Sequence, residues 1–406
     1  GAKSWIERFP NKLFLDRQCQ NPLPLEIPSK ERIKIHLVAV ARGATASAVE
    51  YWKSISKQFC DNHDQTLCQA EPSSGSLMLR TEIEKNQHYD SPFQIGWPLG
   101  KDQYVHVFDD ATLDVILGVL DTVPDFVRYL EKKEELFRRP CENFIVPGEE
   151  DLLATFLSST RAGDLEPSFP PPTGRKFVLL REGAWKELVS DRAFLARMKA
   201  NRISYLWDTL IEFQASHLIA GSAYTMDGDH SVIPIEHVLR KMAEETRLTR
   251  RELGAALHRA RSISRPGMRH TCTILNHGHS RRAYVILTLP KPDDVSYDSY
   301  LEQRREQLIT YCEGCLAKLS LAQEVLGIAM EPYATKTVSV DYMLIAPKNG
   351  ERWAESVPAI LQKLEEEKMW RPETMKVRCV VNHELPQTSS KLTRAVANLI
   401  GKLFQK

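Results

Sequence analysis

The chain has 406 residues, of which 42% are hydrophobic and 26% are charged, with a formal net charge of +1. These values are typical of a soluble globular protein and exclude large-scale disorder, while the length favours two domains. No apolar run reaches the roughly 18 residues of a membrane span, and eight scattered cysteines favour reduced thiols, so we expect a cytoplasmic protein without a membrane partner.

Residues 1–162 predict an N-terminal α/β domain with an open mixed sheet and flanking helices. The sequence begins inside an apparent helix with Trp5 and Ile6 on its apolar side, so we expect the chain to start partway through a longer protein. Thr122 and Asp125 indicate a helix N-cap and its partner. Strands are expected at Ile33–Val40, Ser76–Arg80 and Tyr104–Phe108, and helices at Ala46–Phe59, Leu113–Leu120, Val123–Leu130 and Glu149–Leu157.

A Pro-rich linker is expected at Gly163–Gly174, which carries four prolines. Residues 175–265 predict a short strand at Lys176–Leu180 and then a mainly helical segment. Residues 266–406 predict a second, smaller α/β domain. Its expected elements are a hairpin of His270–Leu275 and Ala283–Leu289, strands at Val325–Met330, Val338–Ile345 and Met375–Val381, and helices at Tyr297–Leu319, Arg352–Glu366 and Ser390–Phe404.

Two sets of residues are candidate metal ligands. Asp109 and Asp110 follow a predicted strand, where a carboxylate pair could hold a divalent ion, although we favour Asp110 as a helix cap and Asp109 as solvated. His270, Cys272, His277 and His279 gather at the hairpin and suit zinc, although a surface hairpin with incidental histidines is favoured. Whether this hairpin binds metal stays open.

Other motifs are incomplete. Cys312 and Cys315 form one CxxC pair inside a predicted helix, where core packing is favoured. Gly96–Lys101 is one residue short of a phosphate-binding loop and lacks its hydroxyl residue. Glu82, Glu84 and Lys85 have the composition of a nuclease triad but the wrong spacing. We therefore assign no catalytic residue to this chain.

The basic centre of the chain is the best binding candidate. Between Arg240 and Arg282 the formal charge is +8, whereas between Asp102 and Glu166 it is −9. This asymmetry predicts a basic surface that binds a phosphate backbone. Alternatively, it predicts that the acidic and basic parts dock on each other, within one chain or between copies of it. A stripe of basic side chains along one side of a predicted helix, together with the basic residues that follow it, would bind phosphates without reading the base sequence. Glutamates nearby can pair with these side chains instead, so a solvated structural helix fits the sequence equally well. The candidate nucleic-acid ligands are Arg247, Arg250, Arg251, His258, Arg259, Arg261 and Arg265.

Several blocks of the chain resemble an uncharacterised bacterial family of larger proteins. The blocks are Gly1-Ala2 with Trp5-Ile6, Leu13–Asp16, Ile33–Val40, Ser74–Met78, Val105–Asp114 and Leu120–Glu131, with a weaker run from Ala283–Pro290 through Arg304-Arg305 to Gly327–Ala329. The resemblance covers about half the chain. It implies that longer members carry, ahead of the position of Gly1, a region similar to restriction-endonuclease-like nucleases, so residues 1–162 would be part of such a core.

The leading hypothesis is that this chain is a portion of a nuclease-related bacterial protein, with a role in defence against foreign DNA, without its own active site. The chain itself would need no cofactor, and Mg²⁺ would serve the full-length protein. The alternative is a non-enzymatic protein that binds nucleic acid or acts as an interaction scaffold, as a homo-oligomer or with a partner protein.

Overall fold

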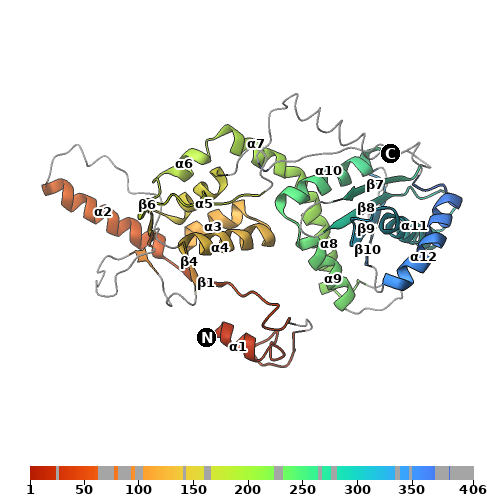
Figure 1. Cartoon of the computed structure of the whole chain (residues 1–406), viewed down its shortest axis with the longest axis horizontal. Coiled ribbons are helices and arrows are strands. Elements are labelled where there is room, and N and C mark those ends of the chain that lie inside the picture. The colour runs from red at the N-terminus through yellow and green to blue at the C-terminus, as the bar shows by residue number, and fades with distance from the viewer. Residues whose placement is uncertain are drawn as a thin grey trace. The chain divides into compact units, whose positions relative to one another are not determined.

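The computed structural model describes residues 1–23, 27–62, 77–80, 93–96, 104–139, 143–159, 166–223, 232–263, 268–275, 281–333, 339–346, 350–370 and 384. The chain is a mixed α/β protein that forms two compact units (Figure 1). Unit 1 comprises Gly1–Lys199 and His383–Gln387, and unit 2 comprises Ala200–Asn382 and Thr388–Lys406. The predicted strand at Met375–Val381 and the predicted helix at Ser390–Phe404 lie outside the described residues.

The strands described in unit 1 form two sheets rather than the single open sheet that the sequence predicts. β1 (Leu37–Ala41) pairs in parallel with β4 (Val105–Asp109), with Val38 opposite His106. The second sheet has the order β3-β2-β5-β6 and is mixed. Its strands are β2 (Met78–Arg80), β3 (Gln94–Ile95), β5 (Asn143–Val146) and β6 (Phe177–Leu179).

Helices supply most of the core of unit 1. The helices that contribute to its main cluster are α3 (Asp110–Val119), α4 (Val123–Phe137), α5 (Glu149–Ser158), α6 (Ala184–Leu188) and α7 (Arg192–Asn201), whose last two residues belong to unit 2. The other helices described are α1 (Ala2–Arg8), which has no buried residue, and α2 (Ala44–Asn62). Phe108 of β4 packs with Ile116 of α3, Leu130 of α4 and Leu152 of α5 in one buried cluster. Most of the apolar stripes of α3 and α4 therefore faces inward, as the spacing predicts, whereas Leu117 and Val123 are 44% and 68% exposed.

The caps of α3 and α4 differ in how well the sequence predicts them. Thr122 caps α4 and accepts a hydrogen bond from the backbone N–H of Asp125, which confirms the predicted cap. At α3 the expected roles are reversed: buried Asp109 is the N-cap, and exposed Asp110 is the first helical residue. Asp109 accepts from the Thr112 N–H and from the Thr45 hydroxyl, both at 2.8 Å. Its carboxylate therefore serves helix and loop geometry rather than solvent.

The Pro-rich segment does not separate the two units. Phe169 is buried, and its ring lies 5.2 Å from that of Phe156 and 6.2 Å from that of Tyr129. Arg139 donates a hydrogen bond to the Pro170 carbonyl at 2.6 Å. Because these contacts place residues 166–174 on unit 1, the division falls after Lys199 instead.

Unit 2 is built on a four-stranded sheet of order β10-β9-β8-β7. The predicted hairpin partners β7 (His270–Leu275) and β8 (Arg282–Thr288) pair antiparallel, as expected. β8 pairs in parallel with β9 (Glu324–Met330) through the crossover helix α11 (Tyr297–Lys318), and β10 (Val340–Ile345) closes the order antiparallel to β9.

Helices cover both faces of this sheet (Figure 1). On one face lie α11 and α12 (Gly350–Glu366), where Cys312 and Cys315 are buried in the core as predicted. On the other lie η2 (Arg202–Ser204), α8 (Tyr205–Ile219), α9 (Val232–Ala243) and α10 (Arg247–Ile263). The predicted helical segment at residues 175–265 is thus divided: its part up to Lys199 belongs to unit 1, and the rest forms one layer of unit 2, because its apolar side packs on the sheet.

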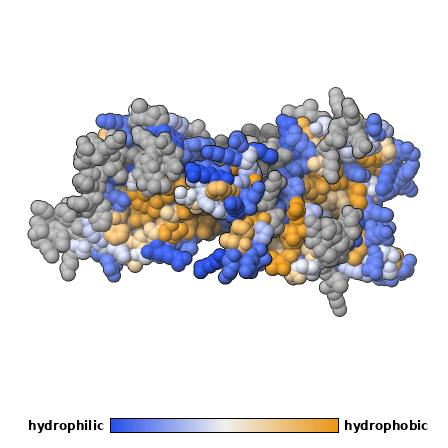
Figure 2. All heavy atoms as spheres, turned by 90° about the horizontal axis from the view of Figure 1, so that it is seen from below, coloured by the Kyte–Doolittle hydropathy of each residue, from blue (hydrophilic) through white to orange (hydrophobic). Residues whose placement is uncertain are grey.

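The molecular surface mixes polar and apolar side chains in both units (Figure 2). Val38 and Val40 of β1 are 43% and 42% exposed. None of the helices in the described part of the chain is both long and apolar enough to span a bilayer.

Candidate nucleic-acid interface

The predicted basic helix exists as α10, and its apolar side packs on the sheet of unit 2. Leu253, Leu257 and Ala260 are buried in a cluster with Tyr284 and Ile286 of β8. Gly254 lets the helix approach η2 closely, because a Cβ at this position would lie 2.1 Å from the Ile203 carbonyl oxygen. The opposite side of the first two turns is therefore pressed against η2 and α8 rather than open to solvent.

In the N-terminal half of α10 the arginines are buried, which contradicts the predicted exposed stripe of basic side chains. Arg247, Arg250 and Arg251 are only 3%, 6% and 8% exposed. Arg247 and Arg250 both form ion pairs with Asp208 of α8, and Arg251 donates to the Asn201 side-chain oxygen. Charge-assisted hydrogen bonds of this kind hold helices together. These three guanidinium groups fasten α10 to its neighbours and do not form the predicted surface for phosphates.

Arg250 is the most completely engaged of the three. Besides Asp208, its guanidinium donates to the Glu245 carbonyl at 2.9 Å and to the Ala243 carbonyl at 2.8 Å. These carbonyls belong to the last residue of α9 and to the connection between α9 and α10, where orphan acceptors at the end of a helix need a donor. Arg250 thus also closes the turn.

The C-terminal half of α10 does carry exposed basic side chains. His258 and Arg259 are exposed, and Arg259 forms no hydrogen bond or ion pair with any residue that the structure describes. Arg261 lies over the ring of Tyr333, with 4.0 Å between the guanidinium carbon and the ring centroid. His258 Nδ1 is 3.3 Å from the Tyr333 hydroxyl. We call His258, Arg259, Arg261 and Tyr333 the α10 patch.

Tyr333 is the member of this patch that the sequence does not indicate. It follows β9, is 45% exposed, and is separated from Arg261 by 72 positions with no shared pattern. A second link runs from the Arg261 guanidinium to the Glu331 carbonyl at 3.2 Å, and the Tyr333 N–H donates to the Arg261 carbonyl. The end of β9 therefore positions the end of α10. Arg265, the last predicted ligand, lies outside the described residues.

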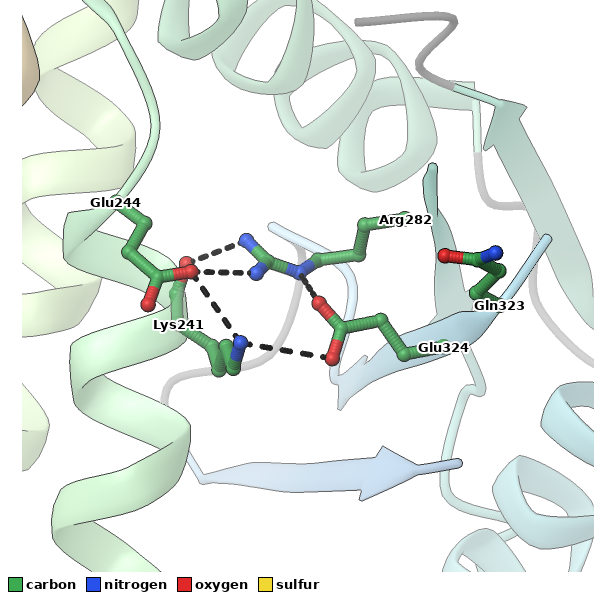
Figure 3. A pocket seen from close by; sticks show the side chains of 5 residues that line it. All are labelled: Lys241, Glu244, Arg282, Gln323 and Glu324. Carbon is green, nitrogen blue, oxygen red and sulfur yellow. Dashed lines mark hydrogen bonds and ion pairs between the residues drawn. The ribbon is translucent and has the colours of Figure 1, made fainter. Parts of the chain in front are cut away.

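A pocket of about 290 Å³ in the same unit is lined by charged groups, but these satisfy one another (Figure 3). Arg282, 1% exposed, donates to Glu244 at 2.7 Å, and to Glu245 and Glu324 at 2.6 Å each. Lys241 Nζ lies 3.4 Å from Glu244 and 3.6 Å from Glu324. With three carboxylates around two cations, this pocket repels anions and offers no phosphate site.

The predicted zinc ligands of the hairpin lie partly outside the described residues, and the CxxC pair is buried in the core. His270 and Cys272 lie two residues apart on β7, and burial raises the pKa of the Cys272 thiol, which disfavours the thiolate that binds metals. His277 and His279 lie outside the described residues. Burial likewise raises the pKa of Cys315 to about 12, in keeping with a core residue.

Comparison of the chain with protein-family models, with curated proteins and with solved structures found no match. The resemblance to proteins with a restriction-endonuclease-like region therefore stays a prediction.

Proposed function

We propose that this chain binds nucleic acid through the α10 patch of unit 2, by contacts to the phosphate backbone. The observation that carries the proposal is the exposed guanidinium of Arg259, next to an Arg261–Tyr333 pair that is already ordered. A pre-positioned arginine loses little side-chain entropy on binding, and its planar fork matches a phosphate. Such contacts position a protein on a backbone without reading the base sequence.

The size of the patch limits the expected affinity. Two arginines that each neutralise one phosphate give a slope of about −2 in a plot of log affinity against log salt. That is smaller than the slope that all seven predicted ligands would give, because three of them are buried. The patch on its own therefore predicts weak, strongly salt-dependent binding that does not depend on sequence.

Fluorescence anisotropy with labelled single-stranded and duplex DNA, titrated from low to high salt, tests this proposal. We expect Arg259→Ala/Arg261→Ala to lower affinity about 10-fold or more at low salt and to reduce the salt slope by about 2. Lys318→Ala/Lys363→Ala is the matched control, since it removes two exposed cations from the other face of the same sheet. Equal losses in both double variants, or no binding by the unaltered chain, would refute the patch.

The wider nuclease-related role, in defence against foreign DNA, is proposed on the resemblance alone. Mg²⁺ would serve a full-length protein in which carboxylates activate the attacking water. For the chain itself we expect retention of supercoiled plasmid in a gel without nicking when Mg²⁺ is added. Nicking by the purified chain would contradict the assignment of no catalytic residue here.

A further inference from the structure

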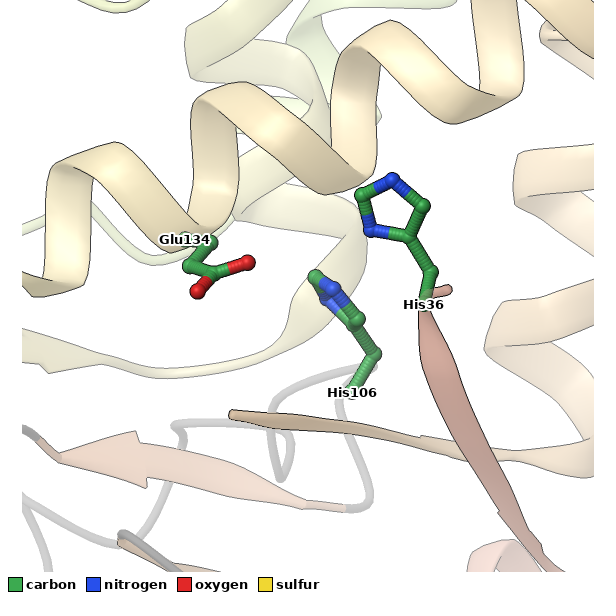
Figure 4. A group of neighbouring side chains, drawn as sticks. All are labelled: His36, His106 and Glu134. Atoms are coloured by element: carbon green, nitrogen blue, oxygen red, sulfur yellow. The ribbon is translucent and has the colours of Figure 1, made fainter. Parts of the chain in front are cut away.

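Two histidines and a glutamate from three separate segments of unit 1 meet over one face of the β1–β4 sheet (Figure 4). His106 lies in β4, and His36 immediately precedes β1. Because Val38 is paired with His106, His36 lies on the same face as both. Glu134 comes from α4, which crosses this face, and its carboxylate is directed toward the His106 ring.

Both imidazole rings hold a buried nitrogen without a hydrogen-bond partner among the residues that the structure describes. These atoms are Nδ1 of His106 and Nε2 of His36. His106 is 1% exposed, and the closest carboxylate oxygen to His36 Nε2, from Glu131, is 3.9 Å away, beyond hydrogen-bond distance. A buried polar atom in a folded protein normally has a partner, so two such nitrogens in one cluster require an explanation.

Burial disfavours the charged form of both imidazole rings. Burial, together with the nearby Lys133 and His36, lowers the pKa of His106 to about 3. Burial and Lys34 also lower the pKa of His36. The ammonium group of Lys133 is itself occupied by Glu149 at 2.6 Å, so it does not take the place of a ligand.

We propose that His36, His106 and Glu134 bind one divalent transition-metal ion of the zinc class. One ligand atom from each residue lies within 4.8 Å of the others. Tetrahedral ligands about 2.1 Å from zinc are about 3.4 Å apart, a spacing that rotation of the partly exposed Glu134 and His36 side chains can reach. Imidazole nitrogens with one carboxylate are the donor set for Zn²⁺ and related ions, whereas Mg²⁺ prefers oxygen ligands.

Neighbouring side chains already orient these ligands. Arg138 donates to Glu134 at 2.8 Å, and the Tyr104 ring packs edge-on against His106 with 4.8 Å between centroids. Such outer contacts fix ligand geometry in metal sites. Three protein ligands would leave the fourth position of a tetrahedral ion for water. The bound ion would connect α4 to β4 and to the residue that precedes β1, and so stabilise unit 1.

The experiment is a Co²⁺ titration of the untagged full chain after treatment with a chelator, followed by displacement with Zn²⁺. We expect one equivalent of Co²⁺ with the visible absorption of a low-coordinate site, and a Zn²⁺-dependent rise in the thermal midpoint. His36→Gln and Glu134→Gln should each weaken binding by at least about 10-fold. Glu135→Gln is the matched control on α4, because its side chain is 63% exposed and pairs with Lys132.

The decisive variants are those at His36 and Glu134, because a substitution at fully buried His106 could disturb folding instead. Absence of saturable one-to-one binding in the unaltered chain overturns the proposal. So does unchanged affinity in both His36→Gln and Glu134→Gln. Neither result depends on DNA, and the α10 patch is tested without metal, so the two proposals stand or fall separately.

Discussion

The ion pair between Lys133 and Glu149 gives the most severe test of how unit 1 is held together. Lys133 and Glu149 side chains are 1% and 3% exposed, with 2.6 Å between Nζ and Oε2. Glu149 also accepts a hydrogen bond from the Tyr129 hydroxyl at 2.6 Å, and Lys133 Nζ lies 4.7 Å from the centre of the Phe108 ring. The pair thus links α4 to the first turn of α5 within the main core.

Lys133→Met should destabilise unit 1 by about 3–5 kcal/mol, because it leaves a buried carboxylate whose charge is no longer compensated. In Lys133→Met/Glu149→Gln the charge is gone and the amide oxygen still accepts from Tyr129. The double variant should therefore recover to within about 1–2 kcal/mol of the unaltered protein. The assay is urea unfolding followed by tryptophan fluorescence, in which Trp185 is in the core cluster of unit 1 and Trp207 is in that of unit 2.

The sign of the pH dependence adds a second readout. Burial lowers the pKa of Lys133, and Glu149 partly opposes this effect. In Glu149→Gln the opposing charge is lost, so the folded state binds fewer protons than the unfolded state at alkaline pH. The stability of Glu149→Gln should accordingly rise with pH between the folded and the unfolded pKa of this lysine. A single Lys133→Met variant as stable as the unaltered chain, or a double variant no better than the single, would refute this account.

Three further changes test other parts of the fold. Gly254→Ala should destabilise unit 2 by about 1–3 kcal/mol or more in urea unfolding, because the new methyl group meets the Ile203 carbonyl; an unchanged midpoint would contradict the close approach. Asp109→Ala should cost about 1 kcal/mol by removing the cap of α3, whereas Asp110→Ala should change stability by no more than about 0.5 kcal/mol; equal losses would contradict Asp109 as the cap, and a larger loss for Asp110→Ala would restore the roles expected from the sequence. Burial and Arg259 lower the pKa of His270, so its contribution to stability is present above the unfolded histidine pKa and is lost as pH falls through the folded pKa. His270→Gln should therefore make unit 2 less sensitive to acid between pH 7 and about 5, and parallel pH profiles for the two proteins would exclude this role.

Periodicity predicts the elements of this chain well wherever one side of an element is buried. The hairpin of β7 and β8 and helix α11 lie close to their predicted bounds, and α4 begins at its predicted Thr122 cap but extends seven residues beyond its predicted end, to Phe137. These features depend on neighbours a few residues away, which a single sequence displays directly. The choice between one sheet and two in unit 1 depends on pairing between distant strands, and no local pattern encodes it.

The candidate sites are harder to predict because each depends on partners that are far away in sequence. A stripe of arginines at helical spacing looks the same whether it faces solvent or a second helix. Asp208, some 40 residues earlier, pairs with both Arg247 and Arg250, and no helical spacing indicates that it lies beside them. In the same way, His36 and His106 each appear as single histidines in apolar runs, and parallel pairing of β1 with β4 is what brings them together.

Much of the basic charge at the centre of the chain is used to specify the fold of unit 2. Arg282 is paired in the sheet with Glu324, and the same two side chains form an ion pair, so a shift of one residue between β8 and β9 would break it. Arg304 is 0% exposed and joins α11 to Asp341 of β10 in the same manner. Because a buried arginine left without its carboxylate is strongly unfavourable, these pairs penalise alternative registers more than they stabilise the native one. A surplus of positive charge in a sequence is therefore weak evidence for nucleic-acid binding, and the α10 patch is proposed because Arg259 is exposed and forms no ion pair with any residue that the structure describes.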